Sequence, residues 1–558
     1  MKKALFIFLI ITAVNFKTAF TLSIENIHVN QTIVTQYNKF ELTLAISNEH
    51  PEDLVIKGIF TDPSQKKSII KGFPCHNQYK IRFTPVITGK YSYQIELKNK
   101  SETIISPSYE FKCLPSNRLK KGFLKKWSVN PHCLIFDNGG FFYILGENRM
   151  NIYDPSWNYK KKGIEDYIKY MKENGMSTLR IFIRNAENIN DSIPHGYLEQ
   201  KTGCYDDTVA DQIDKIIQSC EKYDLYLILT VFALGFTPED SFKDWGNNPY
   251  NYINGGTCKK KEDFFTNKKA IDYQEKRLEY IINRYGYSTH LLAIDLFNEP
   301  EWDCEFEEDL WIPWAIERAK FVKQIDPYNH LITLGSVGPQ WNIKGHEEKW
   351  YKNQVNDMIQ WHPYYGTQSY QKIAYKMRDF IREYWDKNKP VFCGEFAWGK
   401  EDKKTYDHTH NGIWSALLSG GGVLAHSAPP FTPETDEFMT PERAKHFKSL
   451  HSFLKNIAWD KNLKFKPHEI STPSFIKTWC LKNENYAVFW LLDGSKKYGQ
   501  LIKNTDLTIK KMADKSYIIE WWDTRKGSIV HKQKVKAKQG SINIKIPAFY
   551  KDIAGKVY

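Results

Sequence analysis

The fold of this chain is decided by the stretch Leu292-Ala293-Ile294-Asp295-Leu296-Phe297-Asn298-Glu299-Pro300. A strand that is buried on both faces of a parallel sheet has a largely apolar sequence of this kind. The Asn-Glu pair falls at the expected carboxyl end of the strand, where (β/α)8 barrels place their functional side chains. Glu299 is therefore a candidate functional carboxyl group, although most glutamates in proteins are solvated surface charges.

A second apolar stretch ends in the same way, at Pro390-Val391-Phe392-Cys393-Gly394-Glu395-Phe396-Ala397-Trp398. Two such glutamates are less easily explained as surface charges than one. About three strand-helix units separate Glu299 from Glu395, so we expect their carboxyl groups on opposite sides of one barrel rim. A cation near Glu395 would keep it ionised, and a drier site would raise the pKa of Glu299. Arg180, near the end of an earlier strand, is the candidate cation, with a surface arginine as the alternative interpretation.

Apolar strands and amphipathic helices alternate from about Phe141 to Leu454. Eight such units predict a (β/α)8 barrel. A doubly wound open sheet is the rival fold, but Gly146-Glu147-Asn148-Arg149 does not fit the Gly-rich phosphate turn expected after its first strand. The expected barrel strands are 142–145, 178–183, 225–232, the stretch that ends at Glu299, 330–334, 357–361, the stretch that ends at Glu395, and 422–425.

Short segments with period-two alternation flank the barrel, such as Phe40–Ile46 before it and Ser541–Ile546 after it. Their spacing predicts an antiparallel β-sandwich at each end. The segment that connects the first sandwich to the barrel, Arg118 to Lys126, is expected to be a charged linker. The predicted organisation is a signal peptide at 1–22, an N-terminal β-sandwich at 23–116, the barrel at 127–456 and a C-terminal β-sandwich at 462–558.

The first residues, Met1-Lys2-Lys3 and the apolar segment Ala4–Val14, are typical of a secretory signal peptide and too short for a membrane span. We therefore expect an exported protein that is secreted, periplasmic or attached to the cell surface. No membrane-spanning segment is expected, and we expect a monomer.

The net charge of +13 is spread along the 558 residues without a clustered recognition motif, which argues against nucleic-acid binding. A basic surface would suit an anionic polysaccharide or a cell envelope. The nine cysteines show no Cys-x-x-Cys and no histidine pairing at zinc spacing, so we expect neither a metal nor another cofactor. If disulfides form, Cys204, Cys258 and Cys304 are the expected participants, because they lie in predicted loops.

Four motifs in the right order and on the right strands together resemble the cellulase-like family 5 glycoside hydrolases of clan A. They are Gly175-x-x-Thr178-Leu179-Arg180-Ile181 on strand two, Asn298-Glu299-Pro300 on strand four, His362-x-Tyr364 on strand six and Gly394-Glu395-Phe396 on strand seven. The resemblance covers roughly Phe141 to Leu454. His410-Asn411-Gly412-Ile413-Trp414 with Ser419-Gly420-Gly421-Gly422 further resembles a subgroup whose barrel lies between an N-terminal sandwich of unknown function and a small C-terminal sandwich.

The resemblance implies an enzyme that hydrolyses O-glycosidic, β-linked bonds of a poly- or oligosaccharide by double displacement with retention. Glu299 would be the acid/base and Glu395 the nucleophile. Asn298 would donate a hydrogen bond to the sugar hydroxyl next to the anomeric carbon.

Three further positions gain an implied role from the same resemblance. Arg180 and Tyr364 would bond to the carboxylate of Glu395, and His362 would line the sugar subsite. With the catalytic pair, these residues form the candidate site.

Two strand ends depart from the family pattern, and both bear on the choice of sugar. Strand three reads Leu229-Thr230-Val231-Phe232-Ala233 where many relatives have a histidine, and strand eight ends in Ala425-His426-Ser427 where many have a tryptophan. Trp398 could supply the missing aromatic platform, since aromatic rings stack on the apolar faces of sugars. His426 could bond to a substrate hydroxyl.

Two other functions remain open at this point. One is a non-catalytic carbohydrate-binding surface protein in which the barrel is a scaffold, although such a protein gains nothing from a nucleophile with its own cation. The other is a transglycosylase that uses the same residues with a sugar acceptor in place of water. No Ser/His/Asp elbow and no His-Glu-x-x-His motif supports a peptidase.

Overall fold

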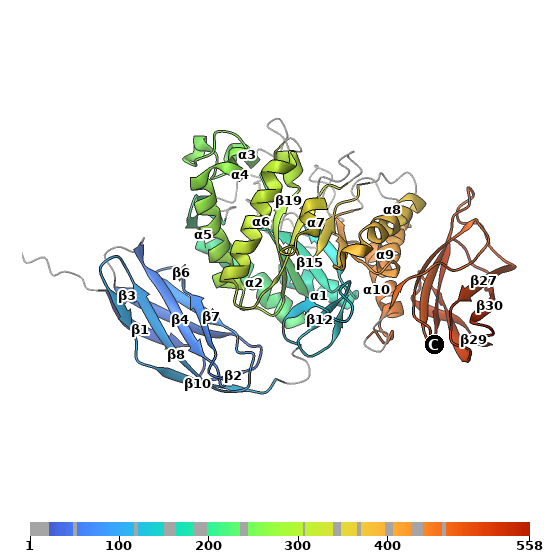
Figure 1. The fold of residues 1–558 in the computed structure, drawn as a ribbon, viewed down its shortest axis with the longest axis horizontal. Coiled ribbons are helices and arrows are strands. Elements are labelled where there is room, and N and C mark those ends of the chain that lie inside the picture. The colour runs from blue at the N-terminus through green and yellow to red at the C-terminus, as the bar shows by residue number, and fades with distance from the viewer. Residues whose placement is uncertain are drawn as a thin grey trace, which may run out of the picture. The chain divides into compact units, whose positions relative to one another are not determined.

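The chain forms two compact units in the computed structural model, one that contains Phe40–Leu114 and one that contains Pro115–Tyr558 (Figure 1). The structure describes residues 22–47, 53–116, 121–149, 163–183, 198–234, 244–304, 307–338, 348–364, 370–396, 405–426, 439–459 and 465–558. The expected signal peptide at 1–22 lies outside these residues except for Leu22. Within them, no helix is both long and apolar enough to span a bilayer.

The first unit is a β-sandwich, as predicted. Phe40 of one sheet stacks on Phe111 of the other with ring centroids 4.2 Å apart, and Phe60 stacks on Phe83 at the same distance. Inward-facing aromatic residues from both sheets therefore make the core. One sheet has the order β1 (Ser23–Val29), β3 (Phe40–Ser47), β7 (Gln78–Phe83) and β6 (Phe73–Cys75); the other has β2 (Ile33–Thr35), β10 (Tyr109–Leu114), β8 (Gly89–Lys98), β4 (Val55–Thr61) and β5 (Lys67–Lys71), with β9 (Thr103–Ile105) beside β8.

The second unit is built on a closed barrel of eight parallel strands, which confirms the predicted fold class (Figure 1). In order, the strands are β14 (Leu145–Arg149), β15 (Thr178–Phe182), β18 (Tyr226–Phe232), β19 (Leu291–Asn298), β20 (Leu331–Ser336), β21 (Ile359–Trp361), β22 (Val391–Cys393) and β23 (Gly422–His426). The described helices that alternate with them are α1 (Ile164–Glu173), α2 (Asp207–Tyr223), α5 (Lys268–Tyr285), α6 (Glu308–Ile325), α8 (Tyr370–Glu383), α9 (Asp407–Leu418) and α10 (Pro441–Leu454), with the short helices α3 (Asp244–Asn247), α4 (Asp263–Thr266) and α7 (Glu348–Lys352) in the loops.

The helices begin where the sequence provides caps. The side chain of Asp206 accepts a hydrogen bond from the Val209 amide at the start of α2, and Asn267 does the same for Ala270 at the start of α5. Such caps satisfy amide groups that have no partner inside the helix. The helices then turn an apolar face toward the barrel, as the periodicity predicted.

The first barrel strand lies later in the chain than predicted. The expected strand at 142–145 is β14 at Leu145–Arg149. β13 (Phe141–Phe142) instead pairs with β12 (Leu134–Phe136), which pairs in turn with β11 (Leu124–Lys126), in a separate antiparallel sheet. The side chain of Phe142 packs in one apolar cluster with residues of the barrel strands, including Ile228 and Leu292. The expected charged linker therefore ends in a strand of this small sheet.

The strands that follow α10 form the C-terminal sheets. The apolar sides of the two sheets share one core that contains Phe489, Trp521 and Leu507. The larger sheet has the order β24 (Lys466–Pro467), β25 (Ile476–Lys482), β26 (Ala487–Asp493), β31 (Asp552–Val557), β28 (Ser516–Asp523) and β29 (Ser528–Lys536), and the smaller one pairs β27 (Thr505–Lys510) with β30 (Ser541–Ile546).

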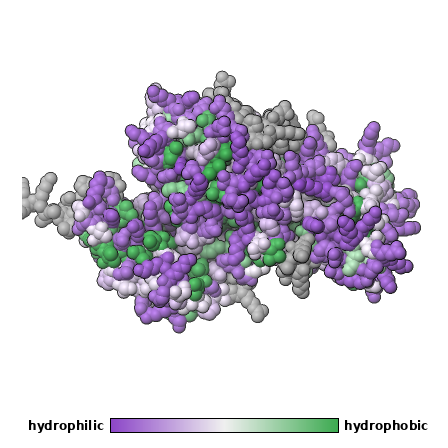
Figure 2. Space-filling view, in the orientation of Figure 1, coloured by the Kyte–Doolittle hydropathy of each residue, from purple (hydrophilic) through white to green (hydrophobic). Residues whose placement is uncertain are grey.

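All nine cysteines are free in the structure, so the expected disulfides among Cys204, Cys258 and Cys304 do not form. Cys258 and Cys304 are buried as free thiols in separate loops, and Cys204 is exposed. Most of the molecular face in Figure 2 is hydrophilic, as expected for a chain with 78 basic and 65 acidic residues.

A buried carboxylate, Asp552, joins the C-terminal sheets to the barrel helices. Its Oδ2 accepts hydrogen bonds from His410 Nε2 of α9 at 2.8 Å, from Trp490 Nε1 at 2.8 Å and from Thr524 Oγ1 at 2.7 Å. Burial alone would raise the pKa of Asp552, but His410, Arg525 and Thr524 outweigh it and hold the pKa well below its ordinary value. The barrel and the C-terminal sheets thus share one charged, fully bonded contact.

Replacing this carboxylate should weaken the unit as a whole. Asp552→Ala leaves three buried donors without an acceptor, and we expect a loss of about 3–5 kcal/mol in the free energy of unfolding. Because the folded-state pKa is depressed, the contribution of Asp552 is complete above the unfolded value of about 3.9 and declines as the pH falls. Thermal melts between pH 3 and 7 would measure the gap between variant and wild type. Asp506→Ala, at an exposed position of β27, is the matched control, and equal melts for both variants would contradict this account.

Candidate active site

The local backbone at the end of β19 turns the Glu299 side chain into the site. Glu299 has φ 51° and ψ 58°, in the left-handed region that residues other than glycine rarely adopt. Its amide N–H donates to the carbonyl of Gly335 at 2.8 Å, and the chain continues into the short helix η3 (Pro300–Asp303). Strained backbone of this kind is concentrated at functional sites.

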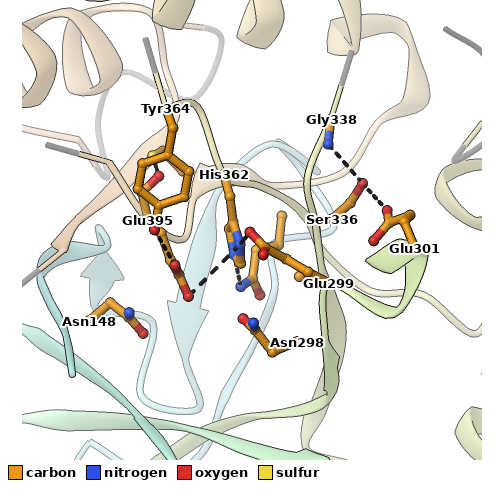
Figure 3. Close-up of polar contacts among 12 residues, drawn as sticks. Asn148, Asn298, Glu299, Glu301, Ser336, Gly338, His362, Tyr364 and Glu395 are labelled. Carbon is orange, nitrogen blue, oxygen red and sulfur yellow. Dashed lines mark hydrogen bonds and ion pairs between the residues drawn. The ribbon is translucent and has the colours of Figure 1, made fainter. Parts of the chain in front are cut away.

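The guanidinium of Arg180 lies at the centre of the site and is fully buried. Its Nη1 donates to Glu395 Oε1 at 2.6 Å, and Tyr364 donates its hydroxyl hydrogen to the other oxygen of the same carboxylate (Figure 3). Asn148 Oδ1 also accepts from Nη1, at 2.8 Å. Glu395 therefore has a cation and a phenol as partners, and both favour its ionised form. These are the contacts that the family resemblance implied for Arg180 and Tyr364.

Glu299 has a different partner, His362. The Nδ1 atom of His362 lies 2.6 Å from Glu299 Oε1 and 3.9 Å from Glu395 Oε1 (Figure 3). The predicted subsite residue thus contacts the candidate acid directly.

The neighbouring Gln360 identifies which of these two groups carries the hydrogen. With its carboxamide oxygen toward Arg180, Gln360 accepts from Arg180 Nε at 3.0 Å and from His362 Nε2 at 3.0 Å, whereas the opposite orientation places the amide nitrogen against the guanidinium donors. In this orientation the hydrogen of a neutral His362 is on Nε2, and Nδ1 is an acceptor. Glu299 is then the donor of the 2.6 Å bond, which requires its protonated form.

The electrostatics of the site agree with this assignment. Burial raises the pKa of Glu299 well above its usual range, and the charge of Glu395 raises it further against the opposing effects of Arg180 and of a hydrogen bond from Trp302. Burial lowers the pKa of His362 to about 4, so its imidazole is neutral at neutral pH. Two neighbouring carboxyl groups with opposite environments are the usual arrangement of an acid and a nucleophile.

The two carboxyl groups are close enough to act on one bond. Oxygen atoms of Glu299 and Glu395 lie within 4.8 Å of each other and of a ring nitrogen of His362. These three side chains could also ligate a metal ion. The 2.6 Å bond between Glu299 and His362 and the nearby Arg180 cation favour a shared proton over a metal in this place.

Asn298 is oriented for substrate binding. Its Oδ1 accepts from Arg180 Nη2 at 3.0 Å, which leaves the amide nitrogen as the group that can donate to a ligand. This geometry is compatible with the role that the sequence resemblance implied for Asn298.

Two glycines make room beneath Glu299 and Glu395. A Cβ atom on Gly335 would lie 2.7 Å from the ring of His362, and one on Gly394 would lie 2.4 Å from the amide of Gln360. The glycine in the Gly394-Glu395-Phe396 motif is thus required by the close approach of Gln360 and His362.

The aromatic and strand-eight predictions are not resolved by the described residues. Trp398 lies outside them. His426 ends β23 beside Asn148 in the barrel register, but its side chain is also outside the description. Trp361, one of the tryptophans near predicted strand ends, is buried and stacks on Phe380, so it belongs to the core.

Sequence reasoning missed three polar side chains that hold the site together: Asn148, Asp295 and Gln360. Each lies within a barrel strand and is fully buried. Asp295 was visible as the one charged residue in the apolar stretch of strand four, which is a signal that could have been used.

Comparisons with known proteins agree with this geometry. Residues 144–422 match the family model described as cellulase, glycosyl hydrolase family 5, and residues 33–98 match a domain of unknown function, DUF5060. The chain belongs to glycosyl hydrolase family 5. This family membership confirms the resemblance on which the strand motifs were interpreted.

The sequence identity between this chain and its curated relatives is modest. The chain is 27% identical over 195 residues to mannan endo-1,4-beta-mannosidase A of Hypocrea jecorina, which covers 34% of this chain and 42% of that protein. It is 25% identical over 232 residues to mannan endo-1,4-beta-mannosidase 5 of Solanum lycopersicum, which covers 38% and 52%. The chain thus spans about half the length of these family 5 relatives.

One solved structure shares the whole architecture. A crystal structure assigned as a glycoside hydrolase from Bacteroides vulgatus superposes with a TM-score of 0.67 over 94% of this chain and 99% of that one, at 14% identity. At this identity the similarity shows the fold alone, a barrel with flanking sheets.

The hydrogen on His362 gives a test of the site. Gln360→Met removes the acceptor that holds the hydrogen on Nε2, so the hydrogen can move to Nδ1 and be donated to an ionised Glu299. We expect the pKa of Glu299 to fall, and the alkaline limb of the pH-rate profile to move to lower pH by about one unit. Gln371→Met on α8, where the amide donates only to C-terminal carbonyls, is the control. An unmoved alkaline limb in Gln360→Met would remove this role from Gln360.

Proposed function

We propose that the chain is a retaining glycoside hydrolase that cleaves β-linked glycans, with β-1,4-mannan as the first candidate substrate. The observation that carries the proposal is the pair of carboxyl groups with oxygens within 4.8 Å of each other, one hydrogen-bonded to His362 and the other paired with Arg180. Retaining enzymes need carboxyl groups about 5–5.5 Å apart, whereas inverting enzymes need about 6.5–9.5 Å. The choice of mannan is supported by the names of the family 5 relatives and by their 24–27% identity.

In the first step, the Glu395 carboxylate attacks the anomeric carbon and forms a covalent ester with the sugar. The bond between the anomeric carbon and the glycosidic oxygen breaks, its electron pair stays on the oxygen, and that oxygen takes the proton of Glu299. The Asn298 amide nitrogen would hold the adjacent sugar hydroxyl. Arg180 and Tyr364 orient Glu395 for attack.

In the second step, the ionised Glu299 removes a proton from water, and the resulting hydroxide attacks the anomeric carbon. The ester bond breaks and returns the Glu395 carboxylate to its contacts with Arg180 and Tyr364. Two inversions at one carbon give net retention. A sugar hydroxyl in place of water would make the same site a transglycosylase.

Export is part of the proposal and is supported by the signal-like residues at the start of the sequence. An exported enzyme that meets polymeric glycans outside the cytoplasm needs no cofactor for this chemistry. N-terminal sequencing of the protein recovered from its native host would show a start near Ser23 if the segment is removed.

The catalytic pair can be tested with a panel of β-mannan, glucomannan and carboxymethyl cellulose scored for new reducing ends. We expect release from mannan by the wild type and a loss of at least about 1,000-fold in Glu395→Gln and Glu299→Gln. Glu348→Gln, at a partly exposed ion pair on α7, should retain full activity. Silence of the wild type across the panel would favour a carbohydrate-binding protein without catalysis, and unchanged activity in Glu395→Gln would exclude it as the nucleophile.

The stereochemical outcome is a second test. During hydrolysis followed by proton NMR, the first product should be the β-anomer, before mutarotation mixes the two forms. The physical reason is the short separation of the carboxyl groups, which leaves no room for a water molecule between Glu395 and the sugar. Initial formation of the α-anomer from a β-linked substrate would contradict the double displacement.

A further inference from the structure

We propose that Asp295 is a positioning residue that divides the charge of Arg180 between two carboxylates and thereby sets the strength of Glu395 as a nucleophile. The inference rests on the proposed function and deepens it. It assigns a role to a side chain that the catalytic steps do not use.

Hydrogen-bond donors surround the carboxylate of Asp295. Its Oδ2 accepts from Arg180 Nε at 2.7 Å and lies 2.6 Å from Nη2 in the same ion pair. The same oxygen accepts from Thr230 Oγ1 at 2.9 Å, and Oδ1 accepts from the Gly335 amide at 3.1 Å. Asp295 has no exposed surface, and both its oxygens are bonded. Strands β15, β18, β19 and β20 therefore converge on one carboxylate.

A strand irregularity brings Asp295 to the barrel axis. Alternation along a regular strand would place Asp295 and Asn298 on opposite faces, since they are three positions apart. Both nevertheless contact Arg180, and the pairing of β19 with β20 shifts register between these two residues. A bulge re-aims side chains in this way.

The guanidinium of Arg180 consequently pairs with two carboxylates. Nε and Nη2 face Asp295, and Nη1 faces Glu395 at 2.6 Å. Burial opposes the charged guanidinium, but Asp295 and Glu395 together outweigh burial and raise the pKa of Arg180. An arginine that faced Glu395 alone would stabilise its negative charge more strongly, and a more stabilised carboxylate attacks carbon less readily.

Among the described residues, the other titratable groups close to these carboxylates are Tyr364, His362, Cys393 and Glu299. Glu395 faces the Tyr364 hydroxyl and, at 3.9 Å, the neutral His362, while the Cys393 thiol lies at its backbone carbonyl. Burial raises the pKa of the Cys393 thiol well above its ordinary value, so it adds no charge. Glu299 is protonated against His362. Arg180 is thus the one cation in contact with Asp295 or Glu395 among the described side chains.

Removal of the Asp295 charge has a predictable sign at both catalytic groups. With Asn at this position, the full charge of Arg180 acts on Glu395, so the acid limb of the kcat/KM profile should move to lower pH. Arg180 also lowers the pKa of Glu299, so a guanidinium freed from Asp295 should move the alkaline limb in the same direction. A residue with a merely structural role would lower the melting temperature without moving either limb.

The experiment is the pH-rate profile of full-length Asp295→Asn on the substrate that the wild type hydrolyses. We expect both limbs to move to lower pH by about one unit and kcat to fall about 10- to 100-fold with little change in KM. Thr230→Val is the matched control, because it removes a neutral hydrogen bond from the same oxygen and keeps both charges. Its limbs should stay in place while its melting temperature falls.

Asp295→Glu keeps the test decisive if Asp295→Asn does not fold. This variant retains the charge but displaces the guanidinium, so we expect a lower kcat with both limbs at the wild-type positions. The proposal would be overturned if the limbs of the pH-rate profile stayed in place in a folded Asp295→Asn. It would also be overturned if they moved to lower pH in Asp295→Glu. An inactive wild type would instead overturn the proposed function, so the two failures are distinguishable.

Discussion

The ion pairs of Arg180 are the interaction on which the rest of the site depends. A guanidinium with no exposed surface has lost its hydration, which is costly unless carboxylates and other acceptors replace the water. Here Asp295 and Glu395 supply the charges, and Asn148 and Asn298 accept further hydrogen bonds. Each of these side chains is held in place because the cation between them has a rigid, planar fork.

That cation also separates the behaviour of the two glutamates. Glu395 is bonded to Arg180 and Tyr364, whereas Glu299 is bonded to a neutral His362. One carboxyl group can therefore be ionised and the other protonated at the same pH, although their oxygens approach within 4.8 Å. The difference does not come from the glutamates themselves; it comes from which neighbours the barrel places beside each one.

The C-terminal sheets are joined to the barrel by the same kind of interaction. Asp552 accepts from His410, Trp490 and Thr524, so helix α9 and strands of the C-terminal sheet share one buried carboxylate. The His410 motif, which the sequence resemblance linked to the domain arrangement, belongs to this contact and not to the substrate site. A residue can thus mark a family subgroup because it joins two domains.

The sequence alone predicted the barrel, the two flanking β regions and the candidate carboxyl groups Glu299 and Glu395, whereas Tyr364 as a partner of Glu395 was implied by the family resemblance. These features depend on period, on apolar runs and on polar residues at strand ends, which are local properties of the chain. The strand register at Asp295 and the position of β14 were decided only by tertiary structure, because they depend on how neighbouring strands pair. The hydrogen on His362 was decided there as well, since Gln360, His362 and Glu299 meet only when strands β19 and β21 are set into one closed barrel. The opening stretch thus revealed Glu299, and only the folded barrel revealed that Asp295, four residues earlier, lies against the same cation as Glu395.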